Sequence, residues 1–279
     1  MSTKSTWAAE TTHKIDRVGI QLYTVREEMK SDFEGTIAKV ASIGYKEVEF
    51  AGLNGHSPKD VRAIIDRNGL TSPSMHVDLN VMQNKWPETL ETAHTLGQSY
   101  ILCAYINAPQ RTADGWKKTT ELFNKAGEAA KKAGIQFGYH NHSFEFESYP
   151  ALGGKTAYDY LLAQLDPQNV IMEMDLCWIS VAGKDPLAYF AKYPGRFPLV
   201  HVKDYVSDPN STKDFEGATG PSIKFKGHLA DVGQGSIDWK KIFSHSDEAG
   251  IKHYFVENDD AKDFNDIKIS YDYLHDLRF

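Results

Sequence analysis

Side chains that can bind a metal ion close most of the short apolar runs in this sequence, instead of being scattered over its polar stretches. Carboxylates and imidazoles are costly to bury alone, and one cation removes that cost for several of them at once. Mixed carboxylate and imidazole ligands point to one divalent ion, manganese, magnesium, zinc or cobalt, and not to an iron–sulfur or copper centre. The candidates are Glu49, His76, His140, His142, Glu145, Asp175, His201, Lys203 and Glu257.

The run VIMEMD starts at Val170 and ends at Asp175. Side chains alternate along a strand, so Glu173 points to the same side as Asp175, and either acid could line a common site. Asp175 lies nearer the carboxyl end and is therefore the better ligand. Its alternative role is structural, as the cap of the turn that follows.

The run LVHVKD places His201 and Lys203 on one side of a strand. An imidazole beside an ammonium suits a metal ligand next to a group that steadies a negatively charged substrate oxygen. Glu257 closes the last run, HYFVEN. In isolation His201 is equally well explained as a core histidine and Glu257 as a surface acid, but their coincidence with Asp175 favours a shared site.

The densest group of candidates is YHNHSFEFE, from Tyr139 to Glu147. His140, His142 and Glu145 are all within reach of one site, and a solvated loop is the alternative interpretation. His142 and Glu145 could serve as ligand and base in either assignment.

The fold must bring these distant residues together, and the pattern between them predicts how. Short β-rich runs alternate with amphipathic stretches, which is typical of βα units around a parallel sheet. In a barrel of such units the carboxyl ends of all strands converge on one pocket. We therefore predict an α/β fold, a single (β/α)8 TIM barrel over residues 15–279 that follows a flexible tail at residues 1–14. The runs begin at Val18, Lys46, Ser72, Ser99, Ile135, Val170, Phe197 and His253.

Helix signals separate the runs. A helix is predicted over residues 33–44, which have apolar residues on one face and end in glycine. A second starts at Ser57 and Pro58 and ends at Gly69, and residues 121–134 form a third. The longest irregular section, 205–235, is expected to lie over the mouth of the barrel. The GxG in GHLADVGQGSIDW is a weak phosphate signal without a Rossmann or P-loop context, and we expect a helix to begin within residues 236–239 instead.

Composition restricts the partners. The 31 Lys+Arg against 38 Asp+Glu give a formal net charge of -7, which argues against nucleic acid. No apolar run approaches the roughly 20 residues that span a bilayer. We expect a small-molecule carbohydrate partner and neither nucleic acid nor membrane, and the sequence leaves the oligomeric state open, a homodimer included. The cytoplasm is the favoured location, with the periplasm as the alternative if a leader has been removed from the polar start.

In their order, the segments GIQLYTVR, GYKEVEF, YHNHSFEF, MEMDLCW, VHVKD, VGQGSIDW and FVEND resemble the xylose isomerase-like TIM barrel superfamily. The nearest branch is the sugar phosphate isomerase/epimerase family, with tagatose-3-epimerase and inosose dehydratase as relatives. The resemblance implies one divalent ion, commonly manganese, held by Asp175, His201, Glu257 and a residue of the fifth strand. The epimerases end that strand with Glu where this sequence has His140, so we assign Glu145 as the fourth ligand, with His142 as its substitute.

The chemistry that the resemblance implies is proton abstraction next to a carbonyl, through a metal-stabilised enediolate. Return of the proton gives an isomerase or epimerase, which is our prediction. Loss of a β-substituent gives the alternative, a lyase or dehydratase acting on a keto-sugar, keto-glycoside or keto-inositol. An endonuclease IV-like nuclease and a non-catalytic sugar-binding protein are further alternatives. The expected catalytic residues are Glu257, His140, His142 and Lys203, and the expected substrate-binding residues are Glu49, His76, Tyr105 and Trp178.

Overall fold

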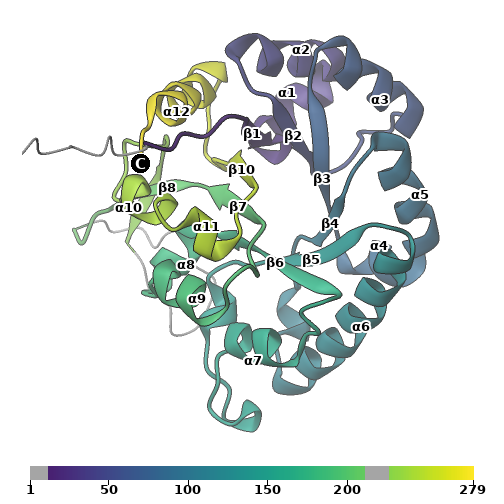
Figure 1. Cartoon of the computed structure of the whole chain (residues 1–279), viewed down its shortest axis with the longest axis vertical. Helices are drawn as coiled ribbons and strands as arrows, with labels where there is room; N and C mark the ends of the chain where they lie inside the picture. Colours follow the sequence, from purple (N-terminus) through teal and green to yellow (C-terminus); the bar gives the residue numbers. More distant parts are fainter. Residues whose placement is uncertain (1–11, 211–225) are drawn as a thin grey trace, which may run out of the picture.

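A closed ring of eight parallel strands forms the centre of the computed structural model, which describes residues 12–210 and 226–279. The strands follow one another in the order β1-β10-β7-β6-β5-β4-β3-β2, and helices surround them (Figure 1). The predicted (β/α)8 barrel is confirmed. Its strands are β1 (Val18–Gln21), β2 (Glu47–Phe50), β3 (Thr71–Val77), β4 (Tyr100–Cys103), β5 (Gln136–His140), β6 (Val170–Asp175), β7 (Leu199–Val202) and β10 (His253–Val256).

Each barrel strand falls in one of the eight predicted apolar runs. β6 is buried at every position, as expected for a strand covered on both faces. Neighbouring strands pair His140 with Glu173 and Asp175 with His201. Paired residues of parallel strands point to the same side, so these registers bring polar side chains of several strands to the same levels of the barrel interior.

The helices cover the outside of the barrel. Ser57 caps α3 through its side chain, with Pro58 at the first helical position, as the sequence predicts. α6 begins at Ala113, well before the predicted start at Glu121, because the side chain of Thr112 provides an earlier cap. The helices are α1 (Arg26–Ser31), α2 (Phe33–Ile43), α3 (Pro58–Arg67), α4 (Leu79–Asn84), α5 (Trp86–Leu96), α6 (Ala113–Lys132), α7 (Ala157–Gln164), α8 (Leu176–Val181), α9 (Pro186–Lys192), α10 (Trp239–Phe243), α11 (Ser246–Ala249) and α12 (Phe264–Asp276).

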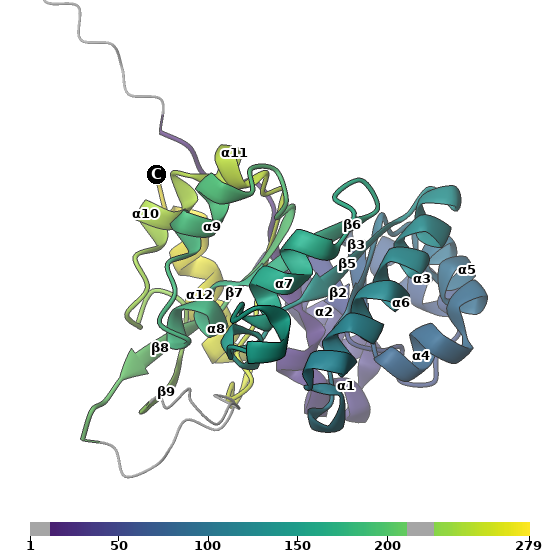
Figure 2. The same cartoon turned by 90° about the horizontal axis from the view of Figure 1, so that it is seen from below.

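The section expected to be irregular, 205–235, is partly regular. β8 (Asp204–Ser207) pairs antiparallel with β9 (Gly227–Ala230), and the two strands protrude at one side of the barrel (Figure 2). Leu229 packs on Cys177 and Trp178, and this apolar contact gives the ribbon a surface to fold against. Residues 211–225 of the section lie outside the described residues.

The carboxylate of Asp204 organises the GxG segment that follows β9. Asp204 is fully buried, and a Cβ atom on Gly235 would lie 2.1 Å from its Oδ1 atom. The glycine therefore lets the backbone approach this carboxylate rather than a phosphate. Five N–H groups point at it, from the backbone of Tyr205, Gly233, Gly235 and Ile237 and the indole of Trp239, at N···O distances of 2.9–3.2 Å.

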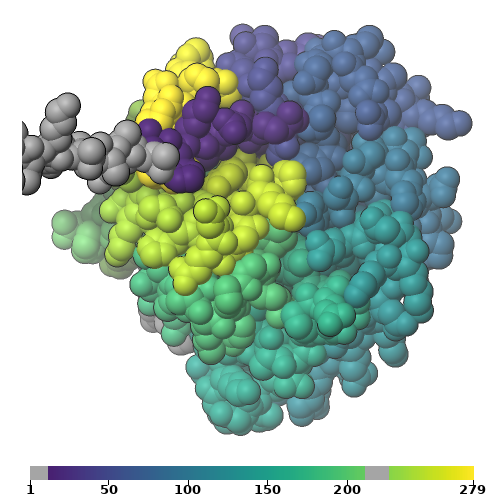
Figure 3. Space-filling view, viewed as in Figure 1, coloured from purple at the N-terminus to yellow at the C-terminus, as the bar shows by residue number. Residues whose placement is uncertain are grey.

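The first described residues lie against the end of the chain (Figure 3). His13 and Phe279 exchange two backbone hydrogen bonds, with N···O distances of 2.7 and 3.0 Å. Residues 1–11 of the expected flexible tail lie outside the described residues. Within the two described ranges, no helix combines the length and apolar character needed to cross a bilayer.

Candidate active site

Four buried side chains from neighbouring strands meet at the carboxyl ends of the barrel strands. His140 and Asp175 end β5 and β6, His201 lies in β7, and Glu257 directly follows β10. One candidate ligand atom from each lies within 4.8 Å of those from the other three. We refer to these four residues as the outer group. Barrel closure makes them neighbours although more than a hundred residues of sequence separate the first from the last.

Asp175 has one oxygen committed to the fold and one available. Its Oδ1 accepts a hydrogen bond from the backbone N–H of Trp178 at 2.8 Å and caps α8. Its Oδ2 is buried without a hydrogen-bond partner in the described ranges, and the nearest cation is Lys203 Nζ at 3.4 Å. Burial raises the pKa of Asp175 to about 6. Its structural and ligand roles are therefore compatible, because they use different oxygens.

His201 is held on both sides by carboxylates. Its Nδ1 lies 2.8 Å from Oε2 of Glu257, and its Nε2 lies 2.8 Å from Oε2 of Glu49. Glu49 is itself fixed by Gln21 Nε2 at 2.7 Å and by the hydroxyl of Ser74 at 2.5 Å. Burial opposes ionisation of Glu49, but the charges and hydrogen bonds of the neighbouring histidines outweigh it and lower the pKa. Glu49, expected to bind substrate, is held against the His201 ring, and we propose that it orients this ring.

Substitution of Glu49 tests this orienting role. Glu49→Gln should weaken divalent-metal affinity by about 10- to 100-fold, because His201 loses the carboxylate that fixes its ring. Titration calorimetry with Mn²⁺ measures the change. Glu47→Gln is the matched control, since Glu47 lies in the same strand but bonds His253 and Arg17 at the other end of the barrel. Equal losses in both variants would show general damage to β2 and contradict the assignment.

Lys203 brings a single positive charge to these acids. Its Nζ lies 2.8 Å from Oε2 of Glu257 and 2.8 Å from Oδ2 of Asp259, and 4.8 Å above the Trp178 ring. Burial opposes the ammonium, but the charges of Asp259, Glu257 and Asp175 outweigh it and raise the pKa of Lys203. Asp259 was missed at the sequence level, although it stands two residues after Glu257 in VEND and continues the same alternation.

The donor set fits a divalent cation. Four carboxyl groups at this end are buried, and Lys203, His76 and His201 offset their charge. Burial opposes the charged form of the two imidazoles, but the carboxylates outweigh it and raise the pKa of both. Two of their oxygens, Asp175 Oδ2 and Glu173 Oε1, have no hydrogen-bond partner in the part of the chain that the structure describes. Such oxygens are costly to bury, and a bound cation would satisfy them. The four carboxyl groups are Glu49, Glu173, Asp175 and Glu257.

Glu145 does not lie with the outer group, although the sequence assigned it as a ligand. Its carboxylate accepts hydrogen bonds from the Tyr139 hydroxyl and, at 2.9 Å, from the backbone N–H of His142. The short helical turn Phe144–Phe146 directs it back toward its own strand. His140 occupies the fourth position instead, and we replace Glu145 by His140 in the proposed ligand set.

The buried carboxyl group of Glu145 should make stability depend on pH. Burial raises its pKa to about 7, above the unfolded value of about 4.3. Between these values the folded protein binds more protons than the unfolded chain, so stability falls as the pH rises. From pH 4.5 to 8 the wild type should lose roughly 3 kcal/mol more than Glu145→Gln, which cannot ionise. Urea unfolding at both pH values measures this, and parallel pH profiles would refute it.

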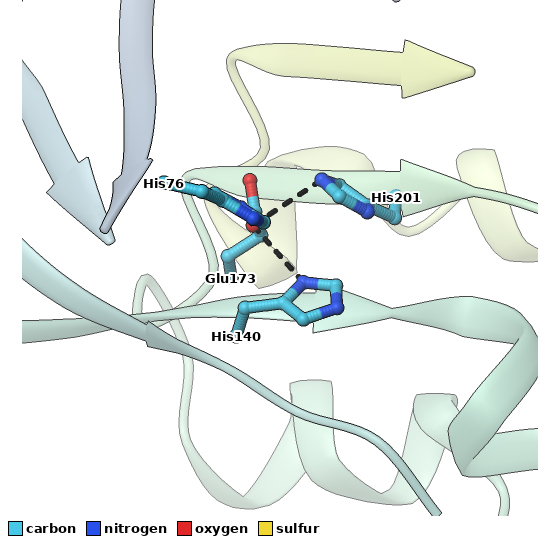
Figure 4. A group of neighbouring side chains, drawn as sticks. All are labelled: His76, His140, Glu173 and His201. Carbon is cyan, nitrogen blue, oxygen red and sulfur yellow. Dashed lines mark hydrogen bonds and ion pairs between the residues drawn. The ribbon is translucent and has the colours of Figure 1, made fainter. Parts of the chain in front are cut away.

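A second group lies beside the outer group and shares two histidines with it (Figure 4). Oε2 of Glu173 is 2.6 Å from His76 Nε2, 3.0 Å from His140 Nδ1 and 3.3 Å from His201 Nε2. We refer to His76, His140, Glu173 and His201 as the inner group, since Glu173 precedes Asp175 along β6. His76, expected to contact substrate, is held here by Glu173 and by Glu49 at 3.1 Å.

Aromatic side chains line one side of the outer group. His142 stacks with Phe144 and Trp178, with ring centroids 5.5 and 6.0 Å away, and makes a T-shaped contact with Tyr105, whose ring centroid is 4.9 Å away. Tyr105 is partly exposed, whereas Trp178 is buried under the Lys203 ammonium. Burial and the charge of Lys203 lower the pKa of His142. The ring is therefore neutral at pH 7, and its Nδ1 is buried and has no hydrogen-bond partner within the described ranges.

Comparison with known proteins identifies the family. The chain belongs to the xylose isomerase-like TIM barrel family, whose model matches residues 37–266. A protein named inosose dehydratase from Lacticaseibacillus casei is 23% identical over 256 residues, which cover 82% of this chain and 84% of that protein. The family predicted from the strand-end segments is therefore confirmed.

Solved structures show the same fold. A sugar phosphate isomerase/epimerase from Parabacteroides distasonis is 26% identical, with a TM-score of 0.75 and coverage of 94% of this chain and 98% of the other. A xylose isomerase-like TIM barrel protein from Mycobacterium smegmatis, in complex with magnesium, is 13% identical, with a TM-score of 0.67 and coverage of 96% and 97%. The second likeness shows the fold alone.

Proposed function

We propose that this chain is a divalent-metal-dependent enzyme that removes a proton next to the carbonyl of a sugar-like substrate. The observation that carries the proposal is the convergence of His140, Asp175, His201 and Glu257, with a buried Asp175 oxygen left without a hydrogen bond. These four residues would hold one ion, manganese ahead of magnesium, zinc or cobalt. When bound, the ion would supply Lewis acidity to the substrate carbonyl.

The residues around the ion have separate roles in this proposal. His142 accepts the proton, because its ring is neutral and its buried Nδ1 has no hydrogen-bond partner in the described chain. The Lys203 ammonium stabilises the negative charge that develops on the carbonyl oxygen. Tyr105, the exposed aromatic beside His142, packs on the apolar face of the substrate ring.

We favour elimination as the outcome, which makes the protein a lyase. The C–H bond next to the carbonyl breaks, its proton passes to His142, a carbon–carbon double bond forms, and a β-hydroxyl leaves as water with a proton from an acid of the site. Two observations support this outcome: the curated relatives are named inosose dehydratase, and a histidine, His140, ends β5 where the epimerases have Glu. An isomerase or epimerase is the second candidate, favoured by the name of the Parabacteroides relative.

Incubation with a keto-inositol in D₂O tests the proposal. With added Mn²⁺ we expect deuterium to appear at the carbon next to the carbonyl and an unsaturated product to accumulate, both visible by proton NMR. A metal chelator should abolish both signals. Deuterium without loss of water would favour the isomerase or epimerase. Absence of exchange with a panel of keto-sugars and keto-inositols, in protein shown to contain the ion, would overturn the proposal.

A further inference from the structure

We propose that the inner group, His76, His140, Glu173 and His201, is a second cation site that prefers zinc and cannot be filled together with the outer site. This inference rests on the proposed function only in taking the outer group as the manganese site. The barrel would thus offer one ion two alternative positions, and the chemical nature of the ion would decide between them.

The geometry of the inner group already approaches that of a metal site. Three imidazole nitrogens surround one oxygen of Glu173, at 2.6, 3.0 and 3.3 Å, and one candidate ligand atom from each residue lies within 4.8 Å of the others. Zinc ligands at about 2.1 Å in a tetrahedron stand about 3.4 Å apart. The His201 contact matches that spacing, and the other two need to lengthen by less than 1 Å. Figure 4 shows the three rings turned toward the same carboxylate.

A second observation points to a ligand at the same place. Oε1 of Glu173 is buried and has no hydrogen-bond partner in the described parts of the chain, although the side chain is fully enclosed. The three imidazoles contact the other oxygen, Oε2. A cation in the inner group that binds both oxygens of Glu173 would satisfy Oε1 as well.

The two sites exclude each other because they share His140 and His201. A neutral imidazole has a single in-plane lone pair, so it can bind only one ion. In His201 the two ring nitrogens face opposite ways, Nδ1 toward Glu257 of the outer group and Nε2 toward Glu173 of the inner group. Whichever nitrogen binds the ion, the other carries the proton and is held by a carboxylate.

Ligand chemistry makes the sites selective. The inner group offers three imidazoles and one carboxylate, whereas the outer group offers two of each. Imidazole-rich sets suit zinc, and carboxylate-rich sets suit manganese and magnesium. Zinc should therefore seat in the inner group, away from the Asp175 and Glu257 oxygens, and should displace manganese when both are present.

Metal affinities of matched variants test the proposal. His76→Asn and Glu173→Gln remove ligands that belong to the inner group alone, and Asp175→Asn removes one that belongs to the outer group alone. Competition with a fluorescent chelator measures Zn²⁺ and Mn²⁺ affinity separately. We expect His76→Asn to weaken Zn²⁺ binding at least about tenfold with little change for Mn²⁺, and Asp175→Asn to do the reverse. Glu173→Gln should weaken Zn²⁺ binding more than Mn²⁺ binding, since Glu173 also fixes the ring of the shared ligand His140 at 3.0 Å. One ion per chain should bind from an equal mixture of the two metals.

The outcomes separate this inference from the proposed function. Unchanged Zn²⁺ affinity in both inner variants, or two ions bound per chain, overturns the inner site as proposed. Unchanged Mn²⁺ affinity in Asp175→Asn instead overturns the outer site, and with it the proposed function. Thermal unfolding of each variant shows that it is folded. His253→Asn is the control that should leave both affinities unchanged, since this partly buried histidine bonds Glu47 at the other end of the barrel.

Discussion

Lys203→Met should lower the free energy of unfolding of the metal-free protein by about 3–5 kcal/mol, the cost of leaving buried acids without their partner. The ammonium contacts Glu257 and Asp259 at 2.8 Å and lies 3.4 Å from Asp175. Methionine keeps the unbranched apolar stem of the side chain and removes the ammonium group. For a chain of this size the loss corresponds to a fall in Tm of roughly 5–9 °C. Thermal unfolding in the presence of a chelator measures it.

A divalent ion should restore part of the stability lost in Lys203→Met. The ion binds the same carboxylates, and at about 100 times its Kd it adds about 2.7 kcal/mol to the folded state. Turnover should nevertheless fall by about 10²–10³, because the charge that supports the substrate oxygen is gone.

Lys192→Met is the control for Lys203→Met, since Lys192 pairs with Asp159 at 3.6 Å on the surface and should contribute little. A stable, metal-insensitive Lys203→Met would refute the account of these charges.

The sequence predicted the barrel and most of the outer group because both depend on short-range patterns. Strand alternation placed Glu173 with Asp175 and His201 with Lys203, and barrel closure then brought the strand ends together. Asp175 illustrates the limit of such reasoning. The pattern offered capping and metal binding as alternatives, whereas its two oxygens allow both.

The sequence does not determine where a side chain points when that depends on a loop or on a partner from another strand. Glu145 follows β5 by a short helical turn, and that turn directs its carboxylate to Tyr139 instead of to the outer group. Glu49 and His76 do end or line strands, but contacts with His201 and Glu173 hold them under the site. No spacing in the sequence specifies such contacts, because they join strands that lie up to about 150 residues apart.

The contacts between the GxG segment and the buried carboxylate of Asp204 give the last prediction. Asp204→Ala should lower the free energy of unfolding by about 3–5 kcal/mol, because five N–H groups, one buried and four partly buried, lose one shared acceptor. Asp204→Asn should cost less but still destabilise, since its amide would turn a donor toward other donors. Urea unfolding of both variants measures the difference.

Asp204→Ala should also affect the active site, because the segment around Asp204 contacts a residue next to a proposed metal ligand. Asp231, at the start of the segment, accepts a hydrogen bond from Nδ2 of Asn258 at 3.1 Å, and Asn258 follows the proposed ligand Glu257. We therefore expect Asp204→Ala to weaken Mn²⁺ binding as well as stability. Asp238→Ala is the matched control. Asp238 caps α10 in the same segment by accepting an exposed hydrogen bond from the backbone N–H of Lys241. Its loss should cost about 1 kcal/mol and leave the metal site intact. Equal effects from the two substitutions would show that the five donors of Asp204 contribute no more than an ordinary helix cap.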